Sequence, residues 1–226
     1  MTFKSWAEVY DERARRFVDP RDICEFYSGD RPCDEAWFQG ACDLIADSLE
    51  LRASDRVLEV GCGCGVLMGR LIERGRSFVG VDPAPGVLEK AAAALPQAAF
   101  HEASAEALPF ADAEFNKCYS YQVVHYFDDL ATAERALLEM RRVVKPGGRI
   151  LLGQVPNAEM HNEYQERRRA RTFARDNRVS HSLRWLWYRP EFFLGFRDRF
   201  ADVQVVRMER AFDPIYRYRM DVVLVV

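Results

Sequence analysis

The spacing of hydrophobic residues changes near residue 56, and this change separates two kinds of secondary structure. Before it, apolar side chains such as Trp6, Val9 and Ala14 recur at helical intervals, and Asp34 can cap a second helix that runs to about Leu49. After it, we expect strands at 57–60, 77–81, 98–101, 115–124 and 149–154, helices at 66–74, 87–95 and 130–144, and a sharp turn at 146–148. This alternation predicts a mostly parallel sheet with helices on both faces.

The end of the chain departs from this alternation. A polar, arginine-rich stretch at 156–184 precedes an aromatic helix near 190–199 and two strands at 203–209 and 217–226. Consecutive strands with no helix between them can pair antiparallel at the edge of a sheet. The expected fold is therefore α/β, a Rossmann-like doubly wound sheet that is mostly parallel with an antiparallel C-terminal edge strand, in one domain over 1–226.

Composition narrows the class of protein. Hydrophobic residues make up 49% of the chain, enough to bury a core, and the net charge of −3 gives no overall attraction to nucleic acid or acidic membranes. The start of the chain lacks the apolar run of a secretory signal, and no stretch approaches the ~18 apolar residues of a membrane span. The six cysteines form no C-x-x-C pair. We expect a cytoplasmic protein with reduced thiols, no metal site and no membrane contact.

A glycine-rich loop carries the clearest chemical signal. The first strand of the alternating region runs into glycines at positions 61, 63 and 65, in the sequence VLEVGCGCG, and a helix follows directly. Glycine permits positive φ and lets the backbone approach a ligand closely, and the start of a helix offers free N–H groups. In an open α/β sheet, ligands bind beyond the carboxyl ends of the strands. The loop therefore predicts a ligand site.

An acidic residue in the next strand narrows the choice of ligand. Asp82 follows Gly61 by about 20 positions, the interval at which an acidic side chain can accept hydrogen bonds from the hydroxyls of an adenosine ribose. A dehydrogenase loop of the form G-x-G-x-x-G would place a glycine at 66, where this chain has Val66. The spacing favours an adenosine-containing cofactor and disfavours a dinucleotide.

The same segments carry a family resemblance. VLEVGCGCG together with VGVDP resembles the first two motifs of the class I S-adenosylmethionine-dependent methyltransferases. Three later stretches resemble further motifs in the family's order: SAEALPF at 104–110, FNKCYSYQVVHYF at 115–127 and LEMRRVVKPGG at 138–148. The resemblance implies a cofactor-binding core at 55–155, with a helical lid at 1–52, a substrate-side insertion at 156–200 and a strand pair at 201–226.

The resemblance implies S-adenosylmethionine as cofactor and assigns roles around its methionine end. Gly61 and Gly63 would contact it through their backbone, with Cys62 between them in the loop. Glu59 would organise the loop, and Ser120 would offer its carbonyl to the amino group of the cofactor.

Further positions would contact the adenosine. Asp82 would bind the ribose, and Pro83 would lie against one face of the adenine. The backbone at Ala105 would read the edge of the adenine, with a side chain nearby. The family usually has Asp where Ser104 stands, so this contact is weaker here or shifts to Glu106.

His125 and Tyr126 are candidates for the acceptor side, and Tyr10 is a candidate contact with the cofactor. His125, at the end of the fourth strand, is either a general base with an ordinary pKa near 6.5 or a histidine that only caps the strand. Tyr126 could orient the substrate or simply pack. Tyr10, on the first helix, is either a lid contact over the cofactor or a core residue.

We expect the chain to transfer a methyl group from S-adenosylmethionine to an oxygen or nitrogen of a small-molecule acceptor, such as a sugar or another anionic metabolite. One alternative is an RNA methyltransferase that uses the basic tract Arg167–Arg178. Another is a non-catalytic S-adenosylmethionine-binding partner subunit. The protein would be a monomer or a homodimer.

Overall fold

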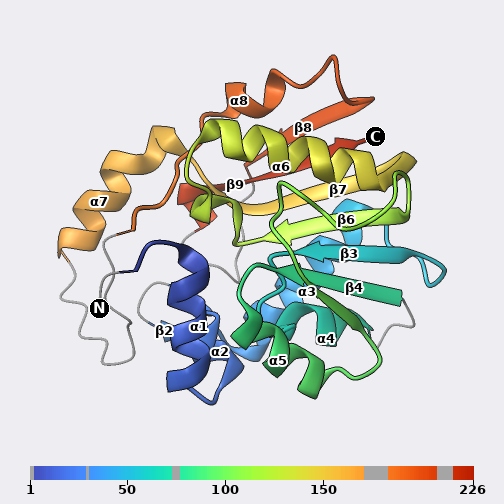
Figure 1. Ribbon diagram of the computed structural model, residues 1–226. Helices are drawn as coiled ribbons and strands as arrows, with labels where there is room; N and C mark the ends of the chain where they lie inside the picture. Colours follow the sequence, from blue (N-terminus) through green and yellow to red (C-terminus); the bar gives the residue numbers. More distant parts are fainter. Residues whose placement is uncertain (1–2, 29–30, 73–76, 171–182, 208–215) are drawn as a thin grey trace.

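The computed structural model describes residues 3–28, 31–72, 77–170, 183–207 and 216–226. Its central sheet contains β3 (Arg56–Val60), β4 (Ser77–Asp82), β5 (Ala99–Glu102), β6 (Phe115–Tyr121), β7 (Val144–Pro156), β8 (Asp202–Val206) and β9 (Arg219–Val225). These seven strands lie in the order β5-β4-β3-β6-β7-β9-β8 (Figure 1). The expected α/β fold class is confirmed.

Strand direction follows the expected pattern. Strands β5, β4, β3, β6 and β7 pair in parallel, whereas β9 pairs antiparallel with both β7 and β8. The last two strands therefore pair with each other as their sequence predicts. Because β9 lies between β7 and β8, the antiparallel strand sits one place in from the edge, and the edge strand β8 runs in the same direction as the parallel set.

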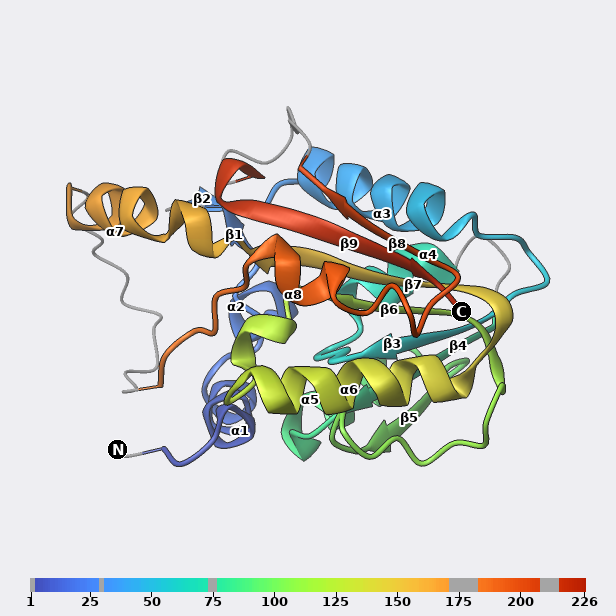
Figure 2. The same ribbon diagram turned by 90° about the horizontal axis from the view of Figure 1, so that it is seen from above.

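Helices cover both faces of the sheet, and the period-two alternation of each strand divides the core between them. Val57 packs into a cluster with α3 (Glu35–Leu49) and α4 (Val66–Ile72). Its neighbour Leu58 packs into the cluster that includes α6 (Leu130–Val143). Figure 2 shows α3 and α6 on opposite sides of the sheet. Strands buried on both faces account for the nearly continuous apolar runs in the sequence.

The N-terminal region folds over α5 (Pro85–Ala94). The expected helices are present as α1 (Trp6–Arg16) and α3, and the Asp34 side chain caps α3 by accepting a hydrogen bond from the Trp37 amide. The short elements α2 (Pro20–Ile23), β1 (Tyr27–Ser28) and β2 (Arg31–Pro32) were not predicted, because two to four residues give no periodic signal. α1 is fixed to α5 by a 2.8 Å hydrogen bond from the Gly86 amide to Asp11.

Two irregularities shape the middle of the sheet. The strand expected to run to Val124 ends at Tyr121, where Gln122 adopts a positive φ of 60° and a 3-10 turn, η1 (Val124–Tyr126), follows. The expected turn at 146–148 lies inside β7 as a bulge, because Phe115 pairs with Val144 whereas Lys117 pairs with Arg149.

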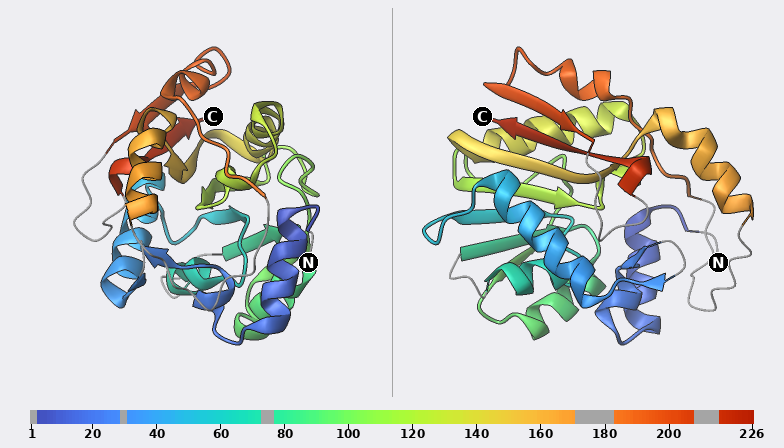
Figure 3. Two further views of the ribbon diagram at one scale, coloured as in Figure 1. Left: turned by 90° about the vertical axis from the view of Figure 1, so that its left-hand side faces the viewer. Right: turned by 180° about the vertical axis from the view of Figure 1, so that it is seen from behind.

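The remaining elements follow β7 and precede β9 in the sequence. They are η2 (Ala158–Met160), α7 (His161–Ala170), α8 (Pro190–Leu194), which is shorter than the helix expected near 190–199, and η3 (Tyr216–Tyr218). Figures 1 and 3 show α1 and α7 at the end of the sheet toward which the parallel strands point. This is the edge where the sequence predicts the ligand site.

Candidate active site

The glycine loop is held in shape by the neighbouring strand. The amides of Gly61 and Cys62 both donate hydrogen bonds to the Val81 carbonyl, at 2.8 and 3.0 Å. Gly61 has a φ of +76°, and a Cβ built on it would lie 2.5 Å from the Val123 side chain. No other residue fits this position without movement of Val123, so the loop requires glycine both for its backbone and for its close approach to η1.

Asp82 joins the ends of β3 and β4. One carboxylate oxygen accepts a hydrogen bond from the Gly63 amide at 2.9 Å, and the other accepts one from the Ala84 amide at 3.0 Å. Burial raises the pKa of Asp82 to about 6, although the two amide hydrogen bonds oppose this rise. Pro83 follows at an exposed position. The structure thus places Asp82, the residue predicted to bind the ribose, in direct contact with the glycine loop.

Two buried polar side chains lie in the strands that lead to this loop. Glu59 is 4% exposed, and its Oε2 atom has no hydrogen-bond partner among the described residues. Burial raises the pKa of Glu59 to about 8, with the Tyr119 hydroxyl opposing the rise, so this carboxyl is protonated at pH 7. Ser120, in β6, is also fully buried, and its hydroxyl has no partner in the described part of the chain.

The segment expected to cover the adenine follows β5. The Ser104 hydroxyl accepts a hydrogen bond from the Glu106 amide at 3.3 Å, with the half-buried Ala105 between them. The Glu106 carboxylate is engaged by Arg135 of α6 at 2.6 Å. Any contact between Glu106 and an adenine therefore has to share or displace this ion pair.

His125 lies in η1 and is almost fully enclosed, at 3% exposed. Its ring centroid is 4.0 Å from that of Tyr126 and 4.7 Å from that of Trp185, and its Nδ1 has no hydrogen-bond partner among the described residues. Burial, reinforced by the charge of Arg219, lowers the pKa of His125 well below 6.5. The ordinary histidine pKa assumed from the sequence is therefore wrong, and the imidazole is neutral at pH 7.

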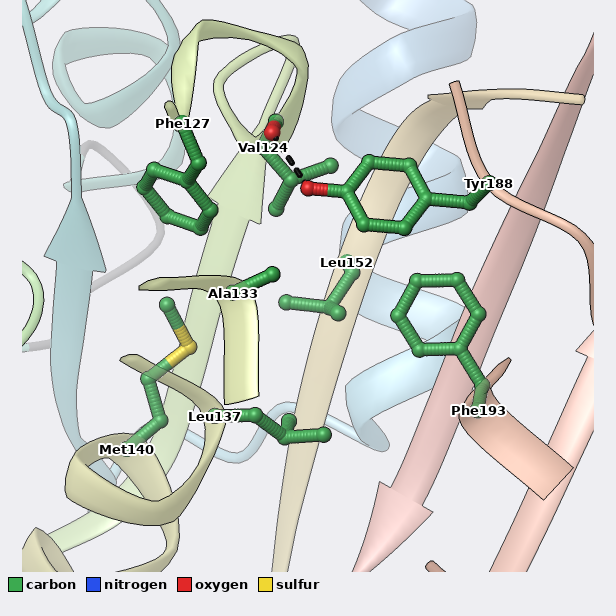
Figure 4. A pocket seen from close by; sticks show the side chains of 8 residues that line it. All are labelled: Val124, Phe127, Ala133, Leu137, Met140, Leu152, Tyr188 and Phe193. Atoms are coloured by element: carbon green, nitrogen blue, oxygen red, sulfur yellow. Dashed lines mark hydrogen bonds between the residues drawn. The ribbon is translucent and has the colours of Figure 1, made fainter. Parts of the chain in front are cut away.

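Two hydrogen bonds hold η1 in position. The Leu186 amide donates to the His125 carbonyl at 2.9 Å, and the Tyr188 hydroxyl donates to the Val124 carbonyl at 2.6 Å. Figure 4 shows the Tyr188 bond at the rim of a small pocket on the α6 side of η1. Apart from Tyr188, the pocket is lined by apolar side chains alone: Val124, Phe127, Ala133, Leu137, Met140, Leu152 and Phe193. It therefore offers packing behind the site rather than a place for a polar acceptor.

The first helix reaches the same site. The Tyr10 hydroxyl donates a hydrogen bond to the Tyr126 hydroxyl at 2.6 Å, and the Trp6 ring lies 4.5 Å from that of Tyr126. Burial raises the pKa of both tyrosines, so both hydroxyls are protonated at pH 7. α1 and η1 are thus joined through Tyr10 and Tyr126 where the parallel strands end.

Comparison with known proteins agrees with this geometry. Residues 58–152 match the family model described as a methyltransferase domain. An uncharacterized methyltransferase of Mycobacterium tuberculosis is 41% identical over 98 residues, which cover 43% of this chain and 39% of that protein. The demethylmenaquinone methyltransferase of Thermus thermophilus is 36% identical over 129 residues, 54% of this chain and 56% of that protein.

A solved structure, the PH0226 protein of Pyrococcus horikoshii, superposes with a TM-score of 0.69 over 92% of this chain and 99% of its own, at 16% identity. Residues 58–152 therefore form a methyltransferase domain. The chain spans 39% and 56% of the two curated relatives named above.

Several residues at this site were not found from the sequence. Cys24 lies against the glycine loop, where its sulfur accepts a hydrogen bond from the Cys64 amide at 3.3 Å. Trp185 contacts His125, and Arg219 lies over the Trp185 ring at 4.9 Å. The aromatic run at 185–188 was the one local signal available. Cys24 and Arg219 reach the site only through tertiary packing.

Other expectations fall partly or wholly outside the described residues. Residues 171–178 of the basic tract Arg167–Arg178 lie outside the described ranges. Within the described ranges, no group of three or more His, Cys, Asp or Glu side chains could hold a metal ion. None of the described helices combines the length and apolar character needed to cross a membrane. All six cysteines are free thiols.

Proposed function

We propose that this chain transfers the methyl group of S-adenosylmethionine to an oxygen or nitrogen of a small-molecule acceptor. The contact between Asp82 and the Gly63 amide carries the proposal, because it places the candidate ribose ligand against the glycine loop. The name of the Thermus relative, a demethylmenaquinone methyltransferase, supports a small-molecule acceptor.

The residues around the loop suit a polar, adenosine-bearing cofactor. The buried Glu59 and Ser120 side chains each have a polar atom with no partner among the described residues, which is unfavourable unless a ligand or water satisfies it. Asp82 would accept hydrogen bonds from the ribose, and the backbone of Gly61 and Gly63 would face the methionine end. Pro83 would lie on the adenine, with the Ser104–Glu106 segment at its edge.

The bound cofactor supplies a methyl group that its sulfonium has already activated. The protein has to align an acceptor behind that methyl, and such positioning can contribute about 7–11 kcal/mol. Tyr10 and Tyr126, joined by their hydroxyls, would cover the site and exclude water. The lid at 1–52 and the insertion at 156–200 would define the acceptor.

His125 would take the proton of a hydroxyl acceptor. Its neutral imidazole is the form that a base requires, and its place at the end of β6 is on the predicted ligand edge of the sheet. Leu186 holds its carbonyl, and Tyr188 holds the carbonyl of the preceding Val124. An amine acceptor that is already unprotonated would need only the positioning.

Two measurements test the proposal. Calorimetry should show one molecule of S-adenosylmethionine or S-adenosylhomocysteine bound per chain at micromolar affinity. Turnover with tritiated methyl groups should then label small molecules from a metabolite extract and leave RNA unlabelled. Failure of both ligands to bind, with tight binding of NAD instead, would overturn the proposal.

The same assays separate the alternatives. Labelling of RNA that declines steeply with salt would favour an RNA methyltransferase, because contacts to phosphates depend strongly on salt. Cofactor binding without turnover on any acceptor would favour a non-catalytic partner subunit.

A further inference from the structure

A row of aromatic rings extends from His125 along the acceptor side of the site. The Trp185 ring lies 4.7 Å from that of His125, Tyr164 of α7 lies 6.3 Å from Trp185, and Trp187 lies 5.3 Å from Tyr164. On the other side of His125, Tyr126 continues the row at 4.0 Å. Except for the enclosed His125, all of these rings are half-buried, so each keeps part of its surface open. We call these five residues the aromatic row.

The backbone holds the aromatic row as a built surface. The Leu186 amide donates to the His125 carbonyl, which fixes Trp185 beside η1. The Tyr188 amide donates to the Pro156 carbonyl at 3.0 Å, and the Ala158 amide donates to the Tyr188 carbonyl at 2.8 Å. Segment 183–189 is therefore tied to both η1 and β7. Trp185 and Trp187, which belong to this segment, are held at the carboxyl edge of the sheet.

A buried cation gives this surface a preference of charge. Arg219 of β9 is 7% exposed, donates to the Gln154 carbonyl at 3.3 Å, and places its guanidinium 4.9 Å from the centre of the Trp185 ring. Its charge also contributes to the lowered pKa of His125. A face of Trp185 is thus already in contact with a cation, so this face is not free to bind a second one. An acceptor here should be neutral or anionic.

The weak basicity of His125 restricts the acceptor further. An imidazole whose pKa lies well below 6.5 removes a proton efficiently only from a comparatively acidic group. A phenol has a pKa of about 10, as in the tyrosine side chain. Bulk water has a pKa near 15.7, and aliphatic alcohols are about as reluctant to ionise. A phenolic hydroxyl therefore suits this base much better than a sugar hydroxyl.

Resting on the methyl transfer proposed above, we propose that the acceptor is a phenol without positive charge, whose ring stacks on the Trp185 side of the aromatic row and whose hydroxyl faces His125. A lone pair of the phenolic oxygen forms the new O–CH3 bond. The CH3–S bond of the sulfonium breaks, and its electron pair stays on sulfur as a neutral thioether. The phenolic proton passes to His125 and from there to water.

Matched probes test the proposal on the protein saturated with S-adenosylhomocysteine. 4-Hydroxyphenylacetate is an anionic phenol, tyramine is a cationic phenol of similar size, and 4-hydroxycyclohexylacetate lacks the aromatic ring. We expect 4-hydroxyphenylacetate to bind about tenfold more tightly than either of the others, as expected for one good aromatic contact or one avoided like-charge contact. Equal or tighter binding of tyramine or of the cyclohexyl compound would overturn the proposal.

Two variants test whether 4-hydroxyphenylacetate binds at Trp185. Trp185→Leu should weaken binding of 4-hydroxyphenylacetate about tenfold while cofactor affinity stays unchanged. The matched control is Phe17→Leu, because Phe17 is also half-buried but packs with Ala14 and Ile23 in a different cluster. Equal losses in the two variants would overturn the placement at Trp185.

Turnover completes the test. With S-adenosylmethionine, mass spectrometry should detect the methyl ether of 4-hydroxyphenylacetate, at a rate that Trp185→Leu lowers. If S-adenosylhomocysteine binds but only amines or aliphatic alcohols are methylated, this inference fails and the proposed function stands. If neither form of the cofactor binds the wild-type chain, the proposed function itself fails.

Discussion

Replacement of Asp82 tests the cofactor site at its most specific contact. Hydrogen bonds to a charged group contribute roughly 1.5–3 kcal/mol each. Asp82→Ala removes the proposed acceptor of two ribose hydroxyls, which water would replace in part. We therefore expect cofactor affinity to decrease by about ten- to a few-hundred-fold. Asp82→Asn keeps one acceptor oxygen and should lose less.

The structure also sets the expected effect on stability. Asp82→Ala leaves the amides of Gly63 and Ala84 without their acceptor, at roughly 1–3 kcal/mol for each amide that water cannot reach. It also removes a half-buried carboxylate whose pKa is raised to about 6. That is about two units above the unfolded value, equivalent to about 3 kcal/mol at pH 7. The two effects oppose each other, so the free energy of unfolding should change little.

The raised pKa predicts a pH dependence of binding. Below pH 6 the Asp82 carboxyl becomes protonated, so cofactor affinity should fall by up to about tenfold per pH unit there, and this slope should vanish in Asp82→Asn. Calorimetric titrations between pH 5 and pH 8, with thermal unfolding of the ligand-free protein, provide the measurement.

Asp55→Asn is the matched control. Asp55 is buried and also accepts a backbone hydrogen bond, from the Arg52 amide at 2.8 Å, but it precedes β3 at the opposite end of that strand. Its replacement should leave cofactor affinity unchanged. An unchanged dissociation constant in Asp82→Ala would refute the reasoning, because the ribose would then lie elsewhere.

Three further substitutions probe the rest of the site. Glu59→Gln should raise the free energy of unfolding by about 1–3 kcal/mol at pH 8 and little at pH 4. The reason is that a carboxyl with a folded pKa of about 8 and an unfolded pKa of ~4.3 destabilises the folded protein increasingly as the pH rises between these two values. Denaturant titrations at the two pH values measure this difference. His125→Ala should lower turnover of a hydroxyl acceptor by roughly 10²–10⁴-fold, or of an amine by about tenfold or less, with cofactor affinity unchanged. The acid limb of the wild-type pH–rate profile should lie below 6.5, and a limb at or above 6.5 would contradict the burial of His125. Tyr188→Phe should destabilise the fold by about 0.5–1.5 kcal/mol and lower turnover without changing the cofactor dissociation constant, whereas no effect on either would show that the bond to Val124 does not hold η1.

The sequence predicts those parts of the molecule that depend on local signals. Short apolar runs predict the core strands, and the closely spaced glycines predict the loop, because its backbone positions are ones that only glycine occupies easily. Asp82 follows from its spacing to Gly61. These features depend on neighbouring residues, so one sequence suffices to locate them.

The remaining features depend on tertiary packing. No glycine marks the positive φ of Gln122, which ends β6 early and forms η1. The lowered pKa of His125 requires burial and the charge of Arg219, which arrives on β9 from the far end of the chain. The place of β9 between β7 and β8 is a matter of strand order, which the hydrophobic pattern leaves open. The acceptor side is therefore the part that the sequence describes least.

A crystal structure of the chain with S-adenosylhomocysteine tests the central claim most directly. We predict that the ribose hydroxyls hydrogen-bond to Asp82, that the methionine end lies along Gly61 and Gly63, and that the sulfur faces His125. A ligand bound away from Asp82 and the glycine loop, or a structure grown at saturating ligand that shows no ligand at this edge of the sheet, would contradict the account.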